Sequence, residues 1–411
     1  MTNSNESVVN SLPPEMEAIR DSALEALGEL EPAGSPRSEA EKRGFILSSR
    51  TNAGRNLPPY YLVYFLFVDL LGFPHLGQWE KVAWSIPVRY RGRLYLIEHR
   101  KFGLGIFAPT LEPSARISST PSSEAEADAS EVAHLIKKGV TAAEAYFQWR
   151  AEQAAAGSML NVVNNSDALF DRYLFFRDRF RALSAEGELR QNERTVKTTT
   201  LEDGTVVRET SFPSSQLMRE ATWIAQSAIE AFFSWTEHAF IHLAILQGRL
   251  NTGDEVARMA EADWKTKFKA ALDVTDPKTK SHYDCLLDLR AQIRNFMAHG
   301  AFGKRGQAFR FHSGAGAVPV LLTHRQAHRY SLTGQPDFDE SRAMLEIDEF
   351  IAHLWSGSRE PARLYVHSSL PSILTFVGDG TYANAMTSVE EMEGLVEHLT
   401  MESDRAANMD W

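Results

Sequence analysis

The 411-residue sequence has a single cysteine, no excess of basic residues and no long apolar run. Cys285 alone cannot form an internal disulfide or a thiolate metal cluster, and this usage is expected of a reducing compartment. Because 54 Asp and Glu outnumber 43 Lys and Arg, the formal net charge is -11, which argues against a protein that coats nucleic acid through overall charge.

Membrane and export signals are also missing. The longest apolar stretch runs from Tyr60 to Leu71, about twelve residues, whereas a membrane helix needs roughly 20. The N-terminal residues lack the basic and apolar regions of a secretion signal. We therefore expect a cytoplasmic protein with no membrane partner.

Phosphate-cradling loops are absent as well. The sequence contains no G-x4-G-K-[ST] loop and no G-x-G-x-x-G segment after a strand. This disfavours NTP hydrolysis and Rossmann-type chemistry, and we expect no cofactor and no resident metal.

The N-terminal third predicts a small α+β module. Residues 1–45 are polar and proline-containing, which indicates a partly disordered lead-in with one helix at 15–30. In residues 46–112, the apolar element 60–70 fits a helix or a strand, and Arg91-Gly92 separates two alternating segments that predict a β-hairpin, with a further strand at 105–108. Residues 113–131 are rich in Ser, Pro, Ala and Glu and predict a linker.

Helical periodicity dominates the rest of the chain. We expect a helical domain over residues 132–360 and a C-terminal strand and helix over 361–411, the strand at 363–376 and the helix at 388–401. Within the helical domain, Asp203-Gly204 predicts the turn of a β-hairpin near 193–211. Long helices are predicted at 216–249, 255–272, 281–299 and 338–356. The fold class is therefore mainly α, a helical bundle with a small N-terminal α+β module and a β-hairpin insertion.

One segment carries a pattern typical of chemistry. Arg294, Asn295 and His299 form R-N-x3-H in the last turn of a predicted helix, and Gly300 stands where a left-handed C-terminal residue belongs. The apolar face of this helix comprises Leu286, Leu289, Ile293 and Met297. Five residues rotate an ideal helix by roughly 140° beyond a full turn, so Arg294 and His299 do not share a face, whereas Asn295 and His299 do.

That geometry leaves three ways to bring the arginine and the histidine together. The long Arg294 side chain reaches around, the helix end unwinds, or a second copy completes the site. The negative end of the helix dipole favours a protonated histidine, and a histidine beside an arginine suits an anion. For RNA cleavage, His299 would transfer protons at the ribose 2′-OH or the 5′-leaving oxygen, and Arg294 would stabilise the phosphate charge, without a metal.

The segment R-N-F-M-A-H-G resembles the R-x4–6-H motif of the HEPN superfamily, whose hallmark is an Arg, a polar residue and a His. The resemblance covers roughly residues 216–300 and leaves the N-terminal module out. It implies an all-helical, commonly homodimeric endoribonuclease that needs no metal and acts on RNA, in many members as a toxin or in antiviral defence. Arg294, Asn295 and His299 would be its catalytic residues.

Local charge favours a polyanion partner. The segment from Glu261 to Tyr330 contains twelve Lys and Arg but only six Asp and Glu, although the chain is acidic overall. Lys304 and Arg305 follow the motif helix and are candidate substrate-binding residues. The helix is preceded by Lys265, Lys267, Lys269, Lys278 and Lys280. The N-terminal module is a candidate receiver for a regulatory partner or trigger.

Competing interpretations remain open. Arg294 and His299 are alternatively explained as a surface ion-pair residue and a helix cap. In that case the chain is a non-catalytic helical scaffold that binds a nucleotide or a protein in the same groove. In the nuclease interpretation, Glu230 or Glu237 would pair with Arg294 and orient it.

Two further patterns suggest metal chemistry less strongly. His238 and His242 have the spacing of two zinc ligands but no third ligand, which favours packing residues. Asp69, Glu98 and Arg100 resemble a metal-dependent nuclease pattern, although a magnesium site needs two or three convergent carboxylates.

Overall fold

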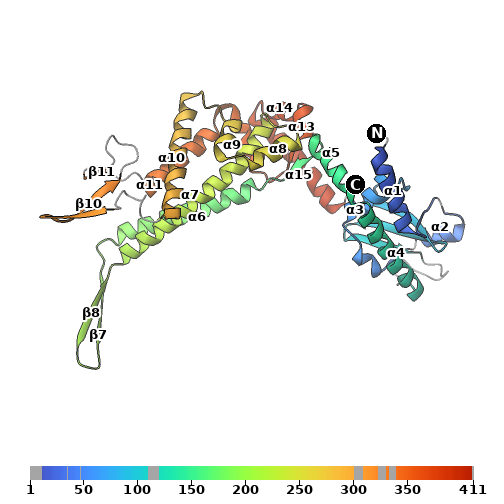
Figure 1. Ribbon diagram of the computed structural model, residues 1–411, viewed down its shortest axis with the longest axis horizontal. Coiled ribbons are helices and arrows are strands. Elements are labelled where there is room, and N and C mark those ends of the chain that lie inside the picture. The colour runs from blue at the N-terminus through green and yellow to red at the C-terminus, as the bar shows by residue number, and fades with distance from the viewer. Residues whose placement is uncertain are drawn as a thin grey trace. The chain divides into compact units, whose positions relative to one another are not determined.

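The computed structural model describes residues 12–34, 36–46, 48–109, 120–299, 309–322, 330–332 and 339–409. For residues 40, 44–46, 294–299, 310, 319, 321–322 and 331 it describes the backbone alone. The described chain is mainly helical, and its strands form small antiparallel sheets (Figure 1). It divides into two compact units: unit 1 comprises Met1–Ala154 and Leu399–Trp411, and unit 2 comprises Ala155–His398.

Unit 1 is built on a five-stranded antiparallel sheet of order β1-β3-β4-β5-β2. Its strands are β1 (Glu31–Pro32), β2 (Ser49–Arg50), β3 (Val82–Tyr90), β4 (Arg93–Arg100) and β5 (Gly103–Ala108). The predicted hairpin is confirmed: Tyr90 pairs with Arg93, and the two turn residues, Arg91 and Gly92, have φ of 50° and 74°. These left-handed values match the right-handed twist of the flanking strands.

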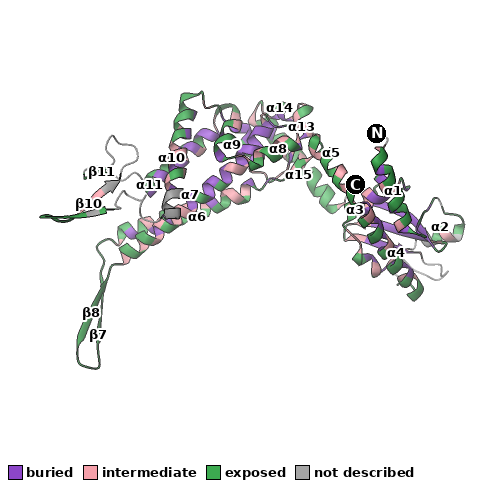
Figure 2. Ribbon diagram, in the orientation of Figure 1, coloured by how far each residue is buried: buried purple, intermediate pink, exposed green. Residues whose placement is uncertain are grey.

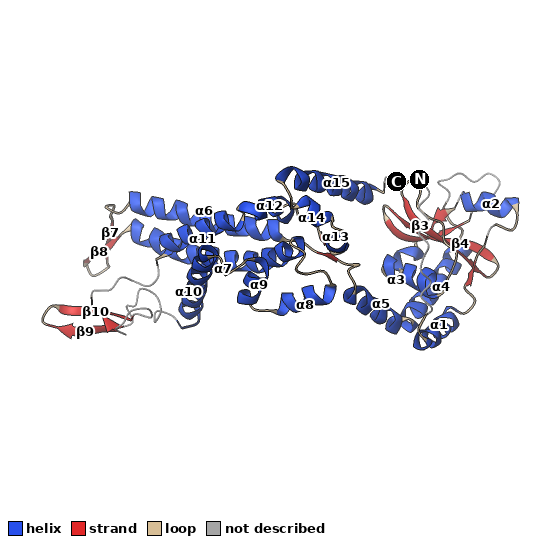
Figure 3. Ribbon diagram, turned by 90° about the horizontal axis from the view of Figure 1, so that it is seen from above, coloured by secondary structure: helices blue, strands red, loops and turns tan. Residues whose placement is uncertain are grey.

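Helices cover one face of this sheet (Figure 3). They are α1 (Pro14–Leu27), α3 (Tyr60–Tyr64), the π-helical turn η2 (Phe65–Leu70) and α4 (Ser123–Ala142). The ambiguous apolar element at 60–70 is therefore helical, and it buries Val63, Leu66, Phe67 and Leu70. α1 buries Ala23 and Leu27 in the same core, so part of the expected lead-in belongs to the folded unit.

The opposite face carries buried apolar residues such as Leu94 and Leu96 together with polar ones. Arg89 of β3 donates to both carboxylate oxygens of Glu41 on α2 (Glu39–Ile46), at 2.6 and 2.9 Å. This contact lowers the pKa of Glu41 to about 2.

The short helix η1 (Ala53–Asn56) lies against β5, and Gly54 allows the approach, because a Cβ there would come within 2.3 Å of the Ile106 nitrogen.

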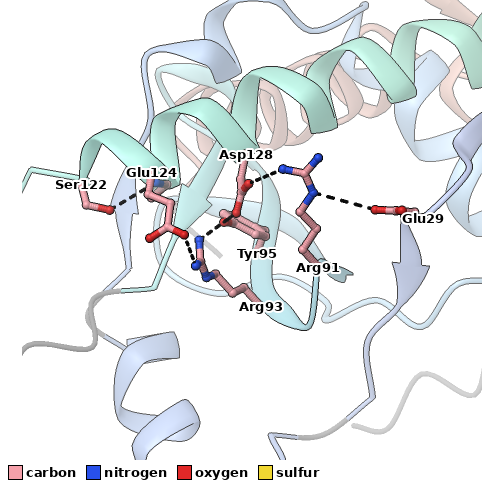
Figure 4. A network of polar contacts seen from close by, with 8 residues as sticks. Glu29, Arg91, Arg93, Tyr95, Ser122, Glu124 and Asp128 are labelled. Carbon is pink, nitrogen blue, oxygen red and sulfur yellow. Dashed lines mark hydrogen bonds and ion pairs between the residues drawn. The ribbon is translucent and has the colours of Figure 1, made fainter.

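A polar network fixes the β3–β4 turn to α4 (Figure 4). The buried Asp128 accepts from the Tyr95 hydroxyl at 2.8 Å and from Arg93 Nη1 at 3.0 Å, and Arg91 Nη1 lies 3.5 Å from its second oxygen. Arg93 also reaches Glu124. α4 begins at Ser123, so the expected linker 113–131 is helical over residues 123–131. Because α4 is held in unit 1, the helical domain expected from residue 132 starts later in the chain, and unit 2 begins at Ala155.

Unit 2 is organised around a pair of long helices, α6 (Ser166–Leu189) and α7 (Pro213–Leu246), which pack side by side (Figures 1 and 3). Trp235 of α7 donates its indole N–H to Ser166 at the start of α6, at 3.0 Å. The predicted hairpin joins the two helices as β7 (Thr195–Thr200) and β8 (Val206–Ser211). Its loop is Leu201–Thr205, and Gly204 supplies the positive φ of 84°.

Shorter helices complete the core of unit 2. They are α8 (Gly253–Glu261), α9 (Trp264–Ala271), α10 (Pro277–His299), α11 (Glu340–Leu354), α12 (Glu360–Val366), α13 (Thr375–Gly378) and α14 (Thr381–Ala385), with the short helix η5 (Gly357–Arg359). Aromatic side chains from several of them meet in the centre: Phe232, Phe240, Trp264, Phe268 and Phe350. Two helices cross the division of the chain, α5 (Glu144–Ala156) and α15 (Val389–Asn408).

Small β elements accompany these helices. β9 (Phe309–Ser313), β10 (Gly316–Leu322) and β11 (Tyr330–Ser331) form a three-stranded sheet, and β6 (Asn161–Val162) pairs with β12 (Ser372–Ile373).

Two secondary-structure predictions are wrong. The segment 363–376 is mostly not a strand: α12 starts at Glu360 with Pro361 in its first turn, and Ala362, Tyr365 and Val366 are buried at helical spacing. The predicted helix 255–272 is two helices, because Asp263 caps a new one by accepting from the Thr266 N–H at 2.9 Å.

The described segments contain no helix that is both long enough and apolar enough to cross a membrane.

Candidate functional site

The helix that carries the R-N-x3-H pattern is α10. It begins after Asp276, whose carboxylate accepts the Thr279 N–H at 2.7 Å, and Pro277 takes the first helical position. Tyr283, Leu286, Leu289 and Ile293 are all buried, so the predicted apolar face is confirmed as far as the side chains are described.

Neighbouring helices hold α10 by polar contacts as well. On the α11 side, Thr279 Oγ1 lies 2.8 Å from His353 Nε2, and the Cys285 thiol donates to Glu346. His282 stacks on His353 with ring centroids 4.9 Å apart. Burial lowers the pKa of both histidines, which favours their neutral forms at pH 7.

A charge cluster, in which only Lys267 is buried, fixes the other side of α10. Glu237 of α7 accepts from Lys267 of α9 at 3.1 Å and from Arg290 of α10 at 2.8 Å. The Lys267 side chain is 7% exposed, whereas Glu237 and Arg290 are 32% and 42% exposed. The Arg290 guanidinium also lies 5.6 Å from the Phe233 ring centroid and 5.9 Å from that of Trp264. The Glu237 carboxylate thus links α7, α9 and α10, and the cluster has two cations for one anion.

Arg294, Asn295 and His299 all lie within α10, whose backbone is helical through His299. The helix therefore does not unwind between the arginine and the histidine, which removes one of the three ways to bring them together. On an unbroken helix they are separated by about 7.5 Å along the axis and roughly 140° around it. A long reach by Arg294 and a second copy remain as the two ways to assemble one site. Gly300, Lys304 and Arg305 lie outside the described residues.

The lysines before the motif divide into two groups. Lys265, Lys269, Lys278 and Lys280 are exposed, and Lys269 and Lys280 lie 5.6 and 5.7 Å from the Tyr283 ring centroid. Lys267 does not belong to this basic surface, because it is buried in the ion pair with Glu237.

Arg290 is the residue that inspection of the sequence missed. It stands one helical turn before Arg294 and pairs with Glu237, one of the two carboxylates predicted to orient Arg294; the other, Glu230, is exposed. The Arg294 side chain lies outside the described residues. The i, i+4 spacing of the two arginines was the available signal, since such residues share a helix face.

His238 and His242 form a hydrogen-bonded chain. The Asn165 N–H donates to His238 Nε2 at 2.8 Å, His242 Nε2 lies 3.1 Å from the same atom, and His242 Nδ1 lies 2.7 Å from the Ser372 hydroxyl. Burial lowers the pKa of His238 and brings that of His242 to about 3. His238 Nε2 is thus an acceptor already in use, and in the described part of the chain no group of three or more His, Cys, Asp or Glu side chains is placed to hold a metal.

Asp69 and Glu98 do not converge. Glu98 alternates along β4 with Ile97, which lies in the helix-covered core, so Glu98 points to the opposite face of the sheet. Asp69 belongs to η2 on the covered side, 3.7 Å from Arg150, while Glu98 pairs with Arg100. The structure therefore contradicts a shared magnesium site for these carboxylates.

Comparison with protein-family models, with curated proteins and with solved structures finds no match to this chain. What α10 does is therefore inferred from its own residues and their surroundings.

Proposed function

We propose that the chain is a metal-independent endoribonuclease of HEPN type, a cytoplasmic enzyme in a toxin or antiviral-defence role, with its active site at the C-terminal end of α10. The observation that carries the proposal is the continuous helix that presents Arg294, Asn295 and His299 in its last two turns. The preceding turns are anchored by a buried apolar face and by the Glu237 ion pairs, so the motif extends from a fixed support.

The reaction would be an attack of the ribose 2′-oxygen on the adjacent phosphorus. The new P–O2′ bond forms as the P–O5′ bond breaks, the 2′-OH gives up its proton, and the 5′-oxygen gains one. His299 would act as general acid or base in these transfers, Arg294 would stabilise the charge on the phosphate oxygens, and Asn295, on the same helix face as His299, would orient the ring. The products would be a 2′,3′-cyclic phosphate and a 5′-hydroxyl.

A homodimer would supply both groups to one RNA. Because α10 stays helical, Arg294 and His299 of one copy stand on different faces of the helix. Two copies that place their α10 ends together would combine the arginine of one with the histidine of the other. The exposed lysines near α10, with Lys304 and Arg305, would attract the RNA backbone. An unrestrained ribonuclease is toxic to its own cell, and unit 1 is a candidate for binding the regulatory partner or trigger.

The test is RNA cleavage by the purified full chain, with and without EDTA. Arg294→Ala and His299→Ala are the test variants; Arg258→Ala on α8 and His398→Ala on α15 change the same residue types at exposed positions elsewhere in unit 2 and serve as controls. Circular dichroism confirms that each variant folds.

We expect cleavage in EDTA by the wild type and both controls, and loss of cleavage in both test variants. Mixing the two test variants should restore part of the activity if the cleft combines two copies. Cleavage that requires a divalent metal, or that survives His299→Ala, contradicts the proposal. RNA or nucleotide binding without cleavage favours the non-catalytic scaffold.

A further inference from the structure

The β7–β8 hairpin has no packing partner among the described residues. Every residue from Gln191 to Phe212 is exposed, and Figure 2 shows the hairpin exposed along its whole length where it projects from α6 and α7. Val196, Val206 and Val207 are 51%, 56% and 45% exposed. A two-stranded hairpin without a covering layer is marginally stable in water, so a further strand or layer would stabilise it.

The hydrogen-bond pattern shows which backbone groups of β7 face outward. The Leu201 N–H donates to the Thr205 carbonyl at 2.9 Å, which makes this pair a hydrogen-bonded one. Antiparallel pairs alternate between bonded and non-bonded, so Lys197 and Thr199 bond to β8. The N–H and C=O groups of Val196, Thr198 and Thr200 therefore point to the open edge. In the described chain, β7 pairs with β8 alone.

Side chains along this edge suit a second β7. The strand reads Thr-Val-Lys-Thr-Thr-Thr, with high β-propensity, no proline and Lys197 as its single protecting charge. When two copies of β7 pair antiparallel about a two-fold axis perpendicular to the sheet, opposite residues have side chains on the same face. Under this condition, the two registers with the greatest overlap place the axis at Lys197 or at Thr198. The first places two lysines opposite each other.

The register centred on Thr198 has no such conflict. It places Thr198 opposite Thr198 of the second copy, Val196 opposite Thr200, and Lys197 opposite Thr199. All three outward-facing residues meet outward-facing partners. The β8 edge is poorer, because its two registers of greatest overlap pair Arg208 with Arg208 or Glu209 with Glu209.

We propose that β7 is a self-association edge, which pairs antiparallel with β7 of a second copy of this chain in the register centred on Thr198. The product is a four-stranded sheet held by about six new backbone hydrogen bonds, two from each of its outward-facing pairs. On one face, Val206 and Thr200 of one copy continue into Val196 and Thr210 of the other.

The edge is tested with two proline variants of the full chain. Thr198→Pro removes an outward N–H from β7 and places the proline ring on the pairing edge. Thr210→Pro is the matched control, because Thr210 faces outward from the opposite edge on β8, and neither residue bonds within the hairpin. Sedimentation equilibrium at micromolar to submillimolar concentration gives the dissociation constant.

We expect dimers from the wild type and Thr210→Pro with similar dissociation constants, and at least about tenfold weaker association of Thr198→Pro, since two of about six hydrogen bonds are lost. A wild type that stays monomeric over the range overturns the proposal. Equal weakening by both prolines also overturns it.

A charge change tests the register. Thr199→Lys places a lysine opposite Lys197 at both symmetric positions of the dimer and should raise the dissociation constant by about two- to thirtyfold. Thr199→Glu places a glutamate there and should lower the dissociation constant by about the same factor. Shifts in the same direction contradict the register. None of these residues lies on α10, and the assay contains no RNA. A dimer that is equally strong in the wild type and in Thr198→Pro uses another interface, such as the α10 ends, and overturns the β7 edge without bearing on RNA cleavage.

Discussion

The Glu237 cluster gives the sharpest prediction about the support of α10. The ammonium of Lys267 is almost fully buried, and its described acidic partner is Glu237. In Glu237→Leu this cation stays buried without its counter-charge. Breaking a buried pair from one side costs roughly 3–5 kcal/mol, and the partial exposure of Glu237 places the expected loss in free energy of unfolding near the low end, about 3 kcal/mol.

Removing the cation instead of the anion should cost much less free energy of unfolding. In Lys267→Met, Glu237 keeps Arg290 as a partner and remains open to water, while the methionine fills the space of the lysine stem. We expect a loss of about 1 kcal/mol or less. The double variant Glu237→Leu with Lys267→Met should lose only about 1–2 kcal/mol, which corresponds to a coupling energy of about 2 kcal/mol.

Urea denaturation at neutral pH measures these differences. Because the chain has two units, amide hydrogen exchange of α9 and α10 should follow the transition, so that the change is assigned to unit 2. Arg290→Met, which removes the more exposed cation, should cost about 1 kcal/mol and serves as the comparison. A double variant as unstable as Glu237→Leu, or a loss under about 1 kcal/mol for Glu237→Leu itself, would refute the reasoning.

Two further perturbations are predicted. Burial depresses the folded-state pKa of His242 to about 3. Its contribution to the free energy of unfolding is therefore complete above pH 6.5 and falls by about 1.4 kcal/mol for each pH unit below that. Urea midpoints measured against pH should give a flatter profile for His242→Gln, whereas the exposed His398→Gln should keep the wild-type profile. Asp128→Ala removes the acceptor of the buried Tyr95 hydroxyl and of Arg93, which should lower the free energy of unfolding of unit 1 by about 2–4 kcal/mol in urea denaturation. The control Glu124→Ala changes an exposed carboxylate and should cost less than about 1 kcal/mol. Equal losses in the two variants would show that the network is not buried.

The parts of the fold that were predictable from sequence are those encoded locally. Arg91-Gly92 and Asp203-Gly204 each mark a hairpin because the turns need left-handed backbone, and Gly92 and Gly204 do have positive φ. The apolar spacing of Leu286, Leu289 and Ile293 likewise sufficed to locate the buried face of α10.

Tertiary contacts decided the rest. Nothing in the α4 sequence says that it packs on the sheet of unit 1, because Asp128 finds Arg93 and Tyr95 only after the chain has folded. Tyr365 and Val366 suit a strand by composition, yet their neighbours in unit 2 bury them on a helix. At the site, the role of Arg290 depends on Glu237, which is 53 residues away in sequence.

The most direct test of the proposed ribonuclease is the chemistry of the cut ends. RNA incubated with the full chain in EDTA should yield fragments that end in a 2′,3′-cyclic phosphate and begin with a 5′-hydroxyl, as mass spectrometry distinguishes, and His299→Ala should yield none. Fragments with 5′-phosphate ends, or cyclic-phosphate ends that persist in His299→Ala, would contradict the assignment of α10 as a metal-independent RNA-cleaving site.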